Sequence, residues 1–249
     1  NKQGFPVFPA NKYLTKTEER VGMMKVFHWT MEAERLWNEQ AGEWHERSRN
    51  MWENGSRKEI IHFFQKFVIK GAKVCDLGCG DGYGTFKLVQ AGYKVTGVDI
   101  SSEMLNKAAI INKGNSARFV KGELEKLPFG NQQFDAVLAI NSLEWTENPL
   151  RALAEMKRIL KDGGKACVGM LGPTAGPRKQ SFPRLYGKRV ICNTMMPWEF
   201  ERLALENGWE KVDELTVFKK DALKLPTERL SGELRQALSF MHVFMLEKK

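Results

Sequence analysis

VCDLGCGDGYGT, residues 74–85, is the stretch that decides the fold. A short apolar run ends at Asp76 and passes into four alternating glycines, Gly78, Gly80, Gly82 and Gly84. Glycine allows sharp turns and close approach of the backbone to a ligand, and a helix that begins there offers unpaired N–H groups. The stretch predicts a strand, a ligand-binding loop and a helix. The alternative is a glycine-rich turn without a ligand.

Short apolar runs rich in β-branched residues recur along the chain on both sides of this loop, separated by segments with helical spacing. The runs are 72–77, 93–100, 117–122, 134–140 and 165–171, and the helical segments are 85–91, 102–112 and 148–160. Such alternation predicts an α/β fold, a doubly wound Rossmann-like sheet. Two closing runs, 209–220 and 238–249, are expected to pair as antiparallel strands. The sheet should therefore be seven-stranded and mostly parallel, with an antiparallel last strand.

Two regions depart from this pattern and divide the chain. Residues 1–55 are expected to form an N-terminal arm and lid helices, and residues 56–249 a core. Within the core, the segment 172–198 is rich in proline, glycine and basic residues and should be a cap-like insertion. It carries Arg178, Lys179, Arg184, Lys188 and Arg189, which could attract a carboxylate, a phosphate or a polynucleotide, or could simply form a solvated basic loop.

Composition sets broad limits on the function. The 249 residues are 42% hydrophobic and 28% charged, which is typical of a globular protein. The net charge of +9 is compatible with a nucleic-acid, lipid or acidic-metabolite partner and equally with an ordinary enzyme. The four cysteines form no CxxC pair, no run approaches the roughly 20 apolar residues of a membrane span, and residues 1–15 lack a signal-peptide core. We expect reduced thiols, no membrane span and a cytoplasmic location.

The glycine spacing narrows the choice of ligand. The dinucleotide pattern G-x-G-x-x-G fails, because Tyr83 or Thr85 stands where its third glycine would be, and no phosphate-loop Gly-Lys-Ser/Thr follows. The remaining pattern, D-x-G-x-G-x-G from Asp76 to Gly82, resembles the class I S-adenosylmethionine-dependent methyltransferases. This resemblance implies that the loop binds the methionine part of S-adenosyl-L-methionine. The residues concerned are Asp76, Gly78, Cys79 and Gly80.

Asp99 ends the next apolar strand, 21 residues beyond Gly78. A carboxylate there can accept two hydrogen bonds from ribose hydroxyls. The alternative is an acid placed to favour the N-terminus of the following helix. Ile100 and Met104 would then offer apolar surface to the adenine.

Two later segments extend the resemblance to the small-molecule, ubiquinone/menaquinone-biosynthesis-like branch (methyltransferase domain 11 type). KGELEKLPF matches the family's third-strand segment with Glu123 in place of the usual Asp, which implies adenine contacts at Glu123 and Leu124. After FDAVLAI, the resemblance implies that Asn141 and Ser142 lie beside the transferable methyl group. The segment lacks the two prolines of nucleic-acid N-methylating members.

Aromatic residues supply candidates for a lid or an acceptor site. Trp37 and Trp44 are seven apart and share a helix face, from which they could cover the cofactor or pack on the core. Trp145 and Tyr186 are further candidates. Glu144, His45 and Tyr186 could act as a base, but nothing in the sequence orients them, and we nominate no catalytic residue.

The sequence therefore predicts methyl transfer by in-line displacement to a small or medium organic acceptor, which could be anionic, with S-adenosyl-L-homocysteine as the product and no metal. The alternatives are an RNA methyltransferase, a non-catalytic S-adenosylmethionine-binding module and, more remotely, a nucleotide-cofactor oxidoreductase. The sequence does not indicate the oligomeric state.

Overall fold

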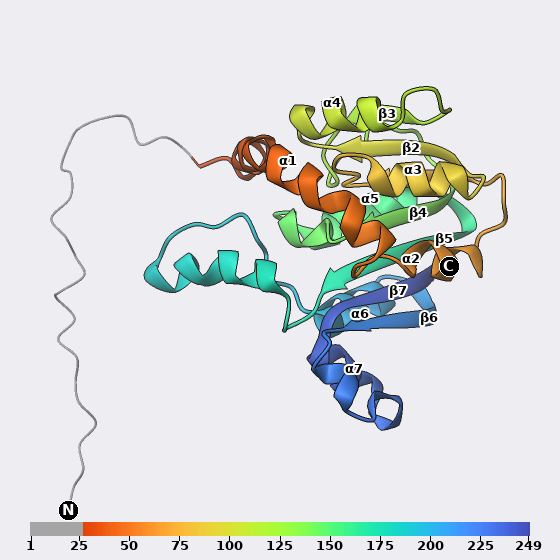
Figure 1. Cartoon of the computed structure of the whole chain (residues 1–249). Helices are drawn as coiled ribbons and strands as arrows, with labels where there is room; N and C mark the ends of the chain where they lie inside the picture. The colour runs from red at the N-terminus through yellow and green to blue at the C-terminus, as the bar shows by residue number, and fades with distance from the viewer. Residues whose placement is uncertain (1–26) are drawn as a thin grey trace, which may run out of the picture.

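The chain folds around one twisted, seven-stranded sheet, which a computed structural model describes for residues 27–249 (Figure 1). Residues 1–26, which make up half of the expected N-terminal arm, lie outside the described residues. The strand order is β3-β2-β1-β4-β5-β7-β6. Only β7 runs antiparallel to its neighbours, β5 and β6. The fold class predicted from the sequence is confirmed. The strands are β1 (Lys73–Leu77), β2 (Lys94–Asp99), β3 (Arg118–Lys121), β4 (Phe134–Ile140), β5 (Leu160–Leu171), β6 (Trp209–Phe218) and β7 (Ser239–Lys248).

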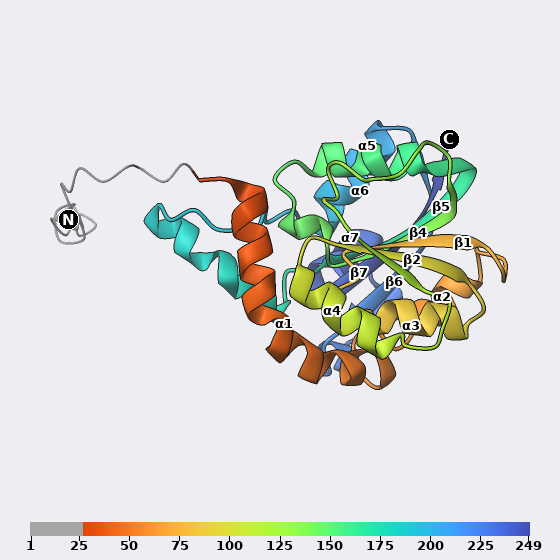
Figure 2. The ribbon, with the colours of Figure 1, turned by 90° about the horizontal axis from the view of Figure 1, so that it is seen from above.

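Helices cover both faces of the sheet. Figure 2 shows α5 and α6 on one face and α3 and α4 on the other. Each face has its own apolar core, one around Met156, Phe200 and Phe244, the other around Phe64 and Leu88. The helices are α1 (Trp29–Glu53), α2 (Ile60–Gln65), α3 (Tyr83–Gln90), α4 (Ser102–Ile111), α5 (Pro149–Ile159), α6 (Pro197–Glu206) and α7 (Gly232–Leu238).

The helix α1 packs across α3 and α4 at the edge where the parallel strands end (Figure 1). The insertion forms a 3-10 helix, η2 (Gly176–Tyr186), that projects on the same side of the molecule. Arg189 of the insertion lies over the ring of Phe27, just before α1, at 5.0 Å from the ring centre. None of the helices in residues 27–249 combines the length and the apolar character that a bilayer span needs.

Two details differ from the sequence expectation. The strand expected over 165–171 begins earlier, at Leu160, directly after α5 ends at Ile159. A register shift opposite Phe134 and Ala136 and the positive φ of Gly163 (69°) accommodate the extra residues. The connection from β6 to β7, for which no structure was expected, contains α7, whose seven residues are too few to show a helical period.

Candidate functional site

The glycine loop is fixed by backbone geometry that only glycine tolerates well. After β1, Gly78, Gly80 and Gly82 all have positive φ, at 69°, 55° and 77°. A Cβ on Gly78 would lie 2.4 Å from the Cβ of Ser142, so the loop and the turn after β4 touch at this point. The backbone of Gly78 and Gly80 lines a cavity at the carboxyl edge of the sheet, where parallel α/β folds bind ligands.

Asp99 connects this loop to the next strand. Its Oδ2 accepts a hydrogen bond from the backbone N–H of Gly80 at 2.8 Å, and its Oδ1 accepts one from Ser101 at 2.9 Å. Burial raises the pKa of Asp99 to about 6, although both N–H donors favour the ionised form. Asp99 thus stands next to the N-terminus of α4 and also faces the cavity described below, so the two sequence interpretations are compatible.

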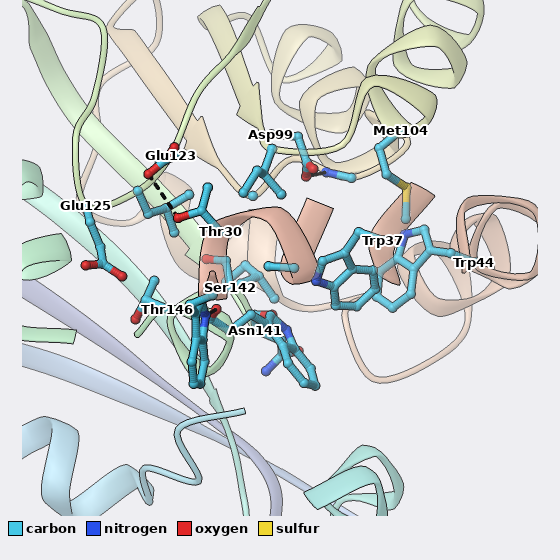
Figure 3. Close-up of a pocket in the computed structure, with 18 residues that line it drawn as sticks. Thr30, Trp37, Trp44, Asp99, Met104, Glu123, Glu125, Asn141, Ser142 and Thr146 are labelled. Atoms are coloured by element: carbon cyan, nitrogen blue, oxygen red, sulfur yellow. Dashed lines mark hydrogen bonds between the residues drawn. The ribbon is translucent and has the colours of Figure 1, made fainter. Parts of the chain in front are cut away.

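A cavity with about 750 Å³ of empty space, part of it open to solvent, lies over the loop (Figure 3). The carboxyl ends of β1, β2 and β4, the turn after β3 and the helix α1 all contribute to it. Its lining residues are Trp29, Thr30, Ala33, Trp37, Trp44, Gly78, Gly80, Asp99, Ile100, Met104, Glu123, Leu124, Glu125, Ile140, Asn141, Ser142, Trp145 and Thr146.

Most residues that the sequence proposed for the cofactor meet in this cavity, but two do not. Gly78, Gly80, Asp99, Ile100, Met104, Glu123, Leu124, Asn141 and Ser142 line it, and so do Trp44 and Trp145. Asp76 instead lies behind the loop, where it accepts a hydrogen bond from Thr85 Oγ1 at 2.6 Å. Cys79 is buried towards Gly97. Both residues were expected to contact the cofactor, but their side chains pack behind the loop and support it.

The helix α1 supplies a wall of indole rings that the sequence only partly indicated. Trp29, Trp37 and Trp44 line the cavity, and Trp37 meets Trp44 and Trp145 edge to face at 5.9 and 5.3 Å between ring centres. The sequence alone left open whether Trp37 covers the cofactor or packs on the core. The spacing of Trp29, Ala33 and Trp37, at every fourth position, is the signal that could have identified this face in advance.

The cap-like insertion supplies none of the residues that line the cavity. Tyr186 is 69% exposed and packs against Phe182 outside the cavity lining, so its role as a lid or substrate residue stays a prediction. Arg178 donates hydrogen bonds to four backbone carbonyls, among them those of Gly172 and Met195. This arginine therefore stabilises the insertion itself.

The insertion does support the cavity wall from behind. Asn193 donates from its side-chain amide to the carbonyls of Leu143 and Thr146 at 2.7 and 3.0 Å. These residues bracket the turn that carries Trp145, so the insertion fixes the turn's position.

The buried arginine Arg57 is a feature that the sequence did not single out. Its guanidinium lies 4.9 Å from the ring centre of Trp44 and 5.5 Å from that of Trp52. It also donates to Asn141 Oδ1 at 3.4 Å, which helps to hold Asn141 at its unusual φ of 54°. Burial lowers the pKa of Arg57 to about 10, which leaves it charged near neutral pH beside the buried carboxylates of the loop.

The three residues that could act as a base do not line the cavity. They are His45, Glu144 and Tyr186. His45 Nδ1 lies 2.9 Å from Asp81 Oδ2 at the outer side of the loop. Glu144 is buried, and its Oε1 accepts the N–H of Leu171 at 2.5 Å, while burial raises its pKa. The carboxylates that do face the cavity are those of Asp99, Glu123 and Glu125.

Comparisons with known proteins agree with this geometry. Residues 75–168 match a family described as a methyltransferase domain. The chain is 33% identical over 149 residues to the biotin biosynthesis bifunctional protein BioHC of Teredinibacter turnerae, covering 55% of this chain and 26% of that protein. It is 31% identical over 159 residues to the demethylmenaquinone methyltransferase of Tropheryma whipplei, covering 59% of this chain and 64% of that one. The chain thus spans less than two thirds of the length of either relative.

A solved structure shows the same fold. It is the complex between the Haloferax volcanii Trm112 methyltransferase activator and a methyltransferase, with a TM-score of 0.65 at 21% identity over 85% of this chain and 96% of that one. The matched stretch contains the glycine loop, and the sheet order fits the shared fold. Residues 75–168 are therefore similar to the methyltransferase domain family, and the chain shares the fold of the solved structure.

Proposed function

We propose that this protein transfers a methyl group from S-adenosyl-L-methionine to a small or medium organic acceptor bound in the cavity beneath α1. The observation that carries the proposal is the meeting, in one cavity, of the open glycine loop, Asp99 and the indole wall. The corresponding enzyme class is EC 2.1.1.-. The four cysteines are buried and unpaired, which supports a cytoplasmic location.

The residues present fit the cofactor. Gly78 and Gly80 present their backbone to the cavity, where the methionine part would lie, and the carboxylate of Asp99 can accept hydrogen bonds from ribose hydroxyls. Ser142 Oγ is buried in the cavity wall without a hydrogen-bond partner among the described residues, and a bound ligand would satisfy it. Ile100, Met104 and Leu124 offer apolar surface for a purine.

The bound cofactor supplies an electrophilic methyl group on a sulfonium. The protein's part is to align the acceptor atom with that methyl group and to exclude water. Asn141 and Ser142 position the reacting end, and the rings of Trp37 and Trp145 add apolar wall to the same cavity. No base needs to lie in the cavity unless the acceptor must lose a proton during transfer.

The division into a lid and a core is part of the proposal. We assign α1, within residues 1–55, to the lid, and residues 56–249 to the core that holds the cofactor, with the insertion at 172–198. The packing of α1 over the mouth of the cavity supports this assignment.

Calorimetric titration with S-adenosylmethionine, S-adenosylhomocysteine and NAD tests the cofactor. We expect micromolar binding of the first two and none of NAD. Incubation of labelled S-adenosylmethionine with a metabolite extract and, separately, with RNA tests the acceptor class. Label that enters RNA alone would overturn the small-molecule proposal, and cofactor binding with no transfer to either would favour a non-catalytic module.

A further inference from the structure

Two rings of the indole wall, those of Trp29 and Trp145, offer carbon surface to a ligand, because their N–H groups are already bonded. Trp29 Nε1 donates to the carbonyl of Trp145 at 2.7 Å, and Trp145 Nε1 donates to the carbonyl of Asn141 at 2.8 Å. The faces and edges of these rings are therefore what a bound acceptor can contact. Aromatic faces attract cations through their quadrupole.

Two carboxylates stand at the same end of the cavity. Glu123 Oε2 accepts a hydrogen bond from Thr30 at 3.3 Å. Glu125 Oε1 accepts the backbone N–H groups of Glu147 and Asn148 at 2.8 and 3.0 Å, whereas its Oε2 has no hydrogen-bond partner within residues 27–249. Figure 3 shows Glu125 beside Thr146, at the opposite end of the cavity from Met104.

The charge of the cavity is opposite to that of the protein. The chain as a whole carries a formal charge of +9. Among the described residues, the cavity is lined by three acidic side chains and by no lysine or arginine. The basic residues that the sequence offered for an anionic acceptor lie in the insertion, outside the cavity. Carboxylates that line a partly enclosed site repel anions and attract cations.

We propose that the acceptor carries a protonated amine, which binds between the rings of Trp29 and Trp145 and the carboxylate of Glu125. This inference rests on the proposed function. The amine serves recognition and keeps its proton, and the methyl group goes to another atom of the acceptor near Asn141 and Ser142. The backbone N–H groups that hold Glu125 Oε1 fix the carboxylate in place, so that Oε2 is available to the ammonium group.

Three small probes of similar shape test the charge preference. They are 2-phenylethylammonium, 2-phenylethanol and 3-phenylpropionate, titrated by NMR into the protein saturated with S-adenosylhomocysteine and into the protein alone. We expect the ammonium to bind at least tenfold more tightly than the alcohol, and the carboxylate most weakly. Glu125→Gln should reduce the ammonium affinity to that of the alcohol, because the amide still accepts the two N–H groups but has no charge.

Glu147→Gln is the matched control, since Glu147 is an exposed neighbour whose side chain does not line the cavity. Equal effects of the two variants, or an alcohol or carboxylate that binds as well as the ammonium, would overturn the proposal. The affinities of the three probes for the wild-type protein test the charge preference even if a variant folds poorly. A protein that does not bind S-adenosylhomocysteine but keeps the ammonium preference would count against the methyltransferase function alone.

Discussion

The two halves of the cavity are built in different ways. The half around Gly78, Gly80 and Asp99 is made largely of backbone, and its parts lie within a short stretch of chain that begins at β1. The opposite half is made of side chains, chiefly indoles from α1 and from the turn after β4. The first half is expected to bind the cofactor, and the second half is expected to determine which acceptor binds. Changes in the two halves should therefore separate cofactor binding from acceptor recognition.

The largest effect is expected from Gly78→Ala. The added Cβ would need a positive φ and would lie 2.4 Å from Ser142 Cβ, so the loop and the turn after β4 would have to separate. We expect affinity for S-adenosylhomocysteine to fall at least about 100-fold, or roughly 3 kcal/mol. Isothermal calorimetry measures this directly.

Gly71→Ala is the matched control for backbone strain. Gly71 also has a positive φ, 87°, but a Cβ there would meet nothing within 4 Å. This variant should lose some stability and keep the wild-type dissociation constant. Equal weakening of cofactor binding by both variants would mean that backbone strain alone causes it. The close contact between Gly78 and Ser142 would then not matter for cofactor binding.

Asp99→Ala should have the next largest effect. It removes the carboxylate expected to accept ribose hydrogen bonds, together with its bond to the N–H of Gly80. We expect cofactor affinity to fall by about 1 to 3 kcal/mol while the chain stays folded. Calorimetry and circular dichroism give the two readouts, and an unchanged dissociation constant would remove Asp99 from the site.

The sequence predicted the first half of the cavity better than the second for a physical reason. A turn that needs positive φ favours glycine, and an acidic residue that ends an apolar run marks the end of β2. Both features can be seen in a short stretch of sequence. Gly78, Gly80 and Asp99, which were predicted to bind the cofactor, do line one cavity. Local patterns do not show which way a side chain points, which is why Asp76 and Cys79 were placed in the cavity although they support the loop from behind.

The second half depends on packing between distant segments. Trp29 meets Trp145 only because α1 crosses the edge of the sheet, and no local pattern predicts that crossing. Tyr186 was chosen because it is aromatic and lies in a basic insertion, but the insertion projects away from the cavity. Arg57 was missed because a single arginine in a helical region gives no signal of burial.

A smaller effect is expected from pH. The pKa of Asp99 is raised to about 6 in the unliganded protein, and the ribose hydroxyls donate to its ionised form. Binding should therefore be fully developed above pH 7 and weaken as the pH falls through 6, by about tenfold at pH 5. Calorimetry at several pH values checks this. Asp99→Asn should bind weakly with little pH dependence, and a variant that keeps the full wild-type profile would assign the titration to another group, such as Asp76.

The smallest effect, and the one that separates the halves most clearly, is expected from Trp29→Phe. The phenyl ring keeps an aromatic surface at the cavity but loses the hydrogen bond from Nε1 to the carbonyl of Trp145. We expect the free energy of unfolding to fall by about 1 kcal/mol, measured by urea denaturation, with cofactor affinity unchanged. Trp198→Phe is the control, since Trp198 is 42% exposed on α6 and does not line the cavity. If Trp29→Phe binds the cofactor much more weakly, the indole wall also holds the cofactor. The two halves of the cavity would then not be separate in function.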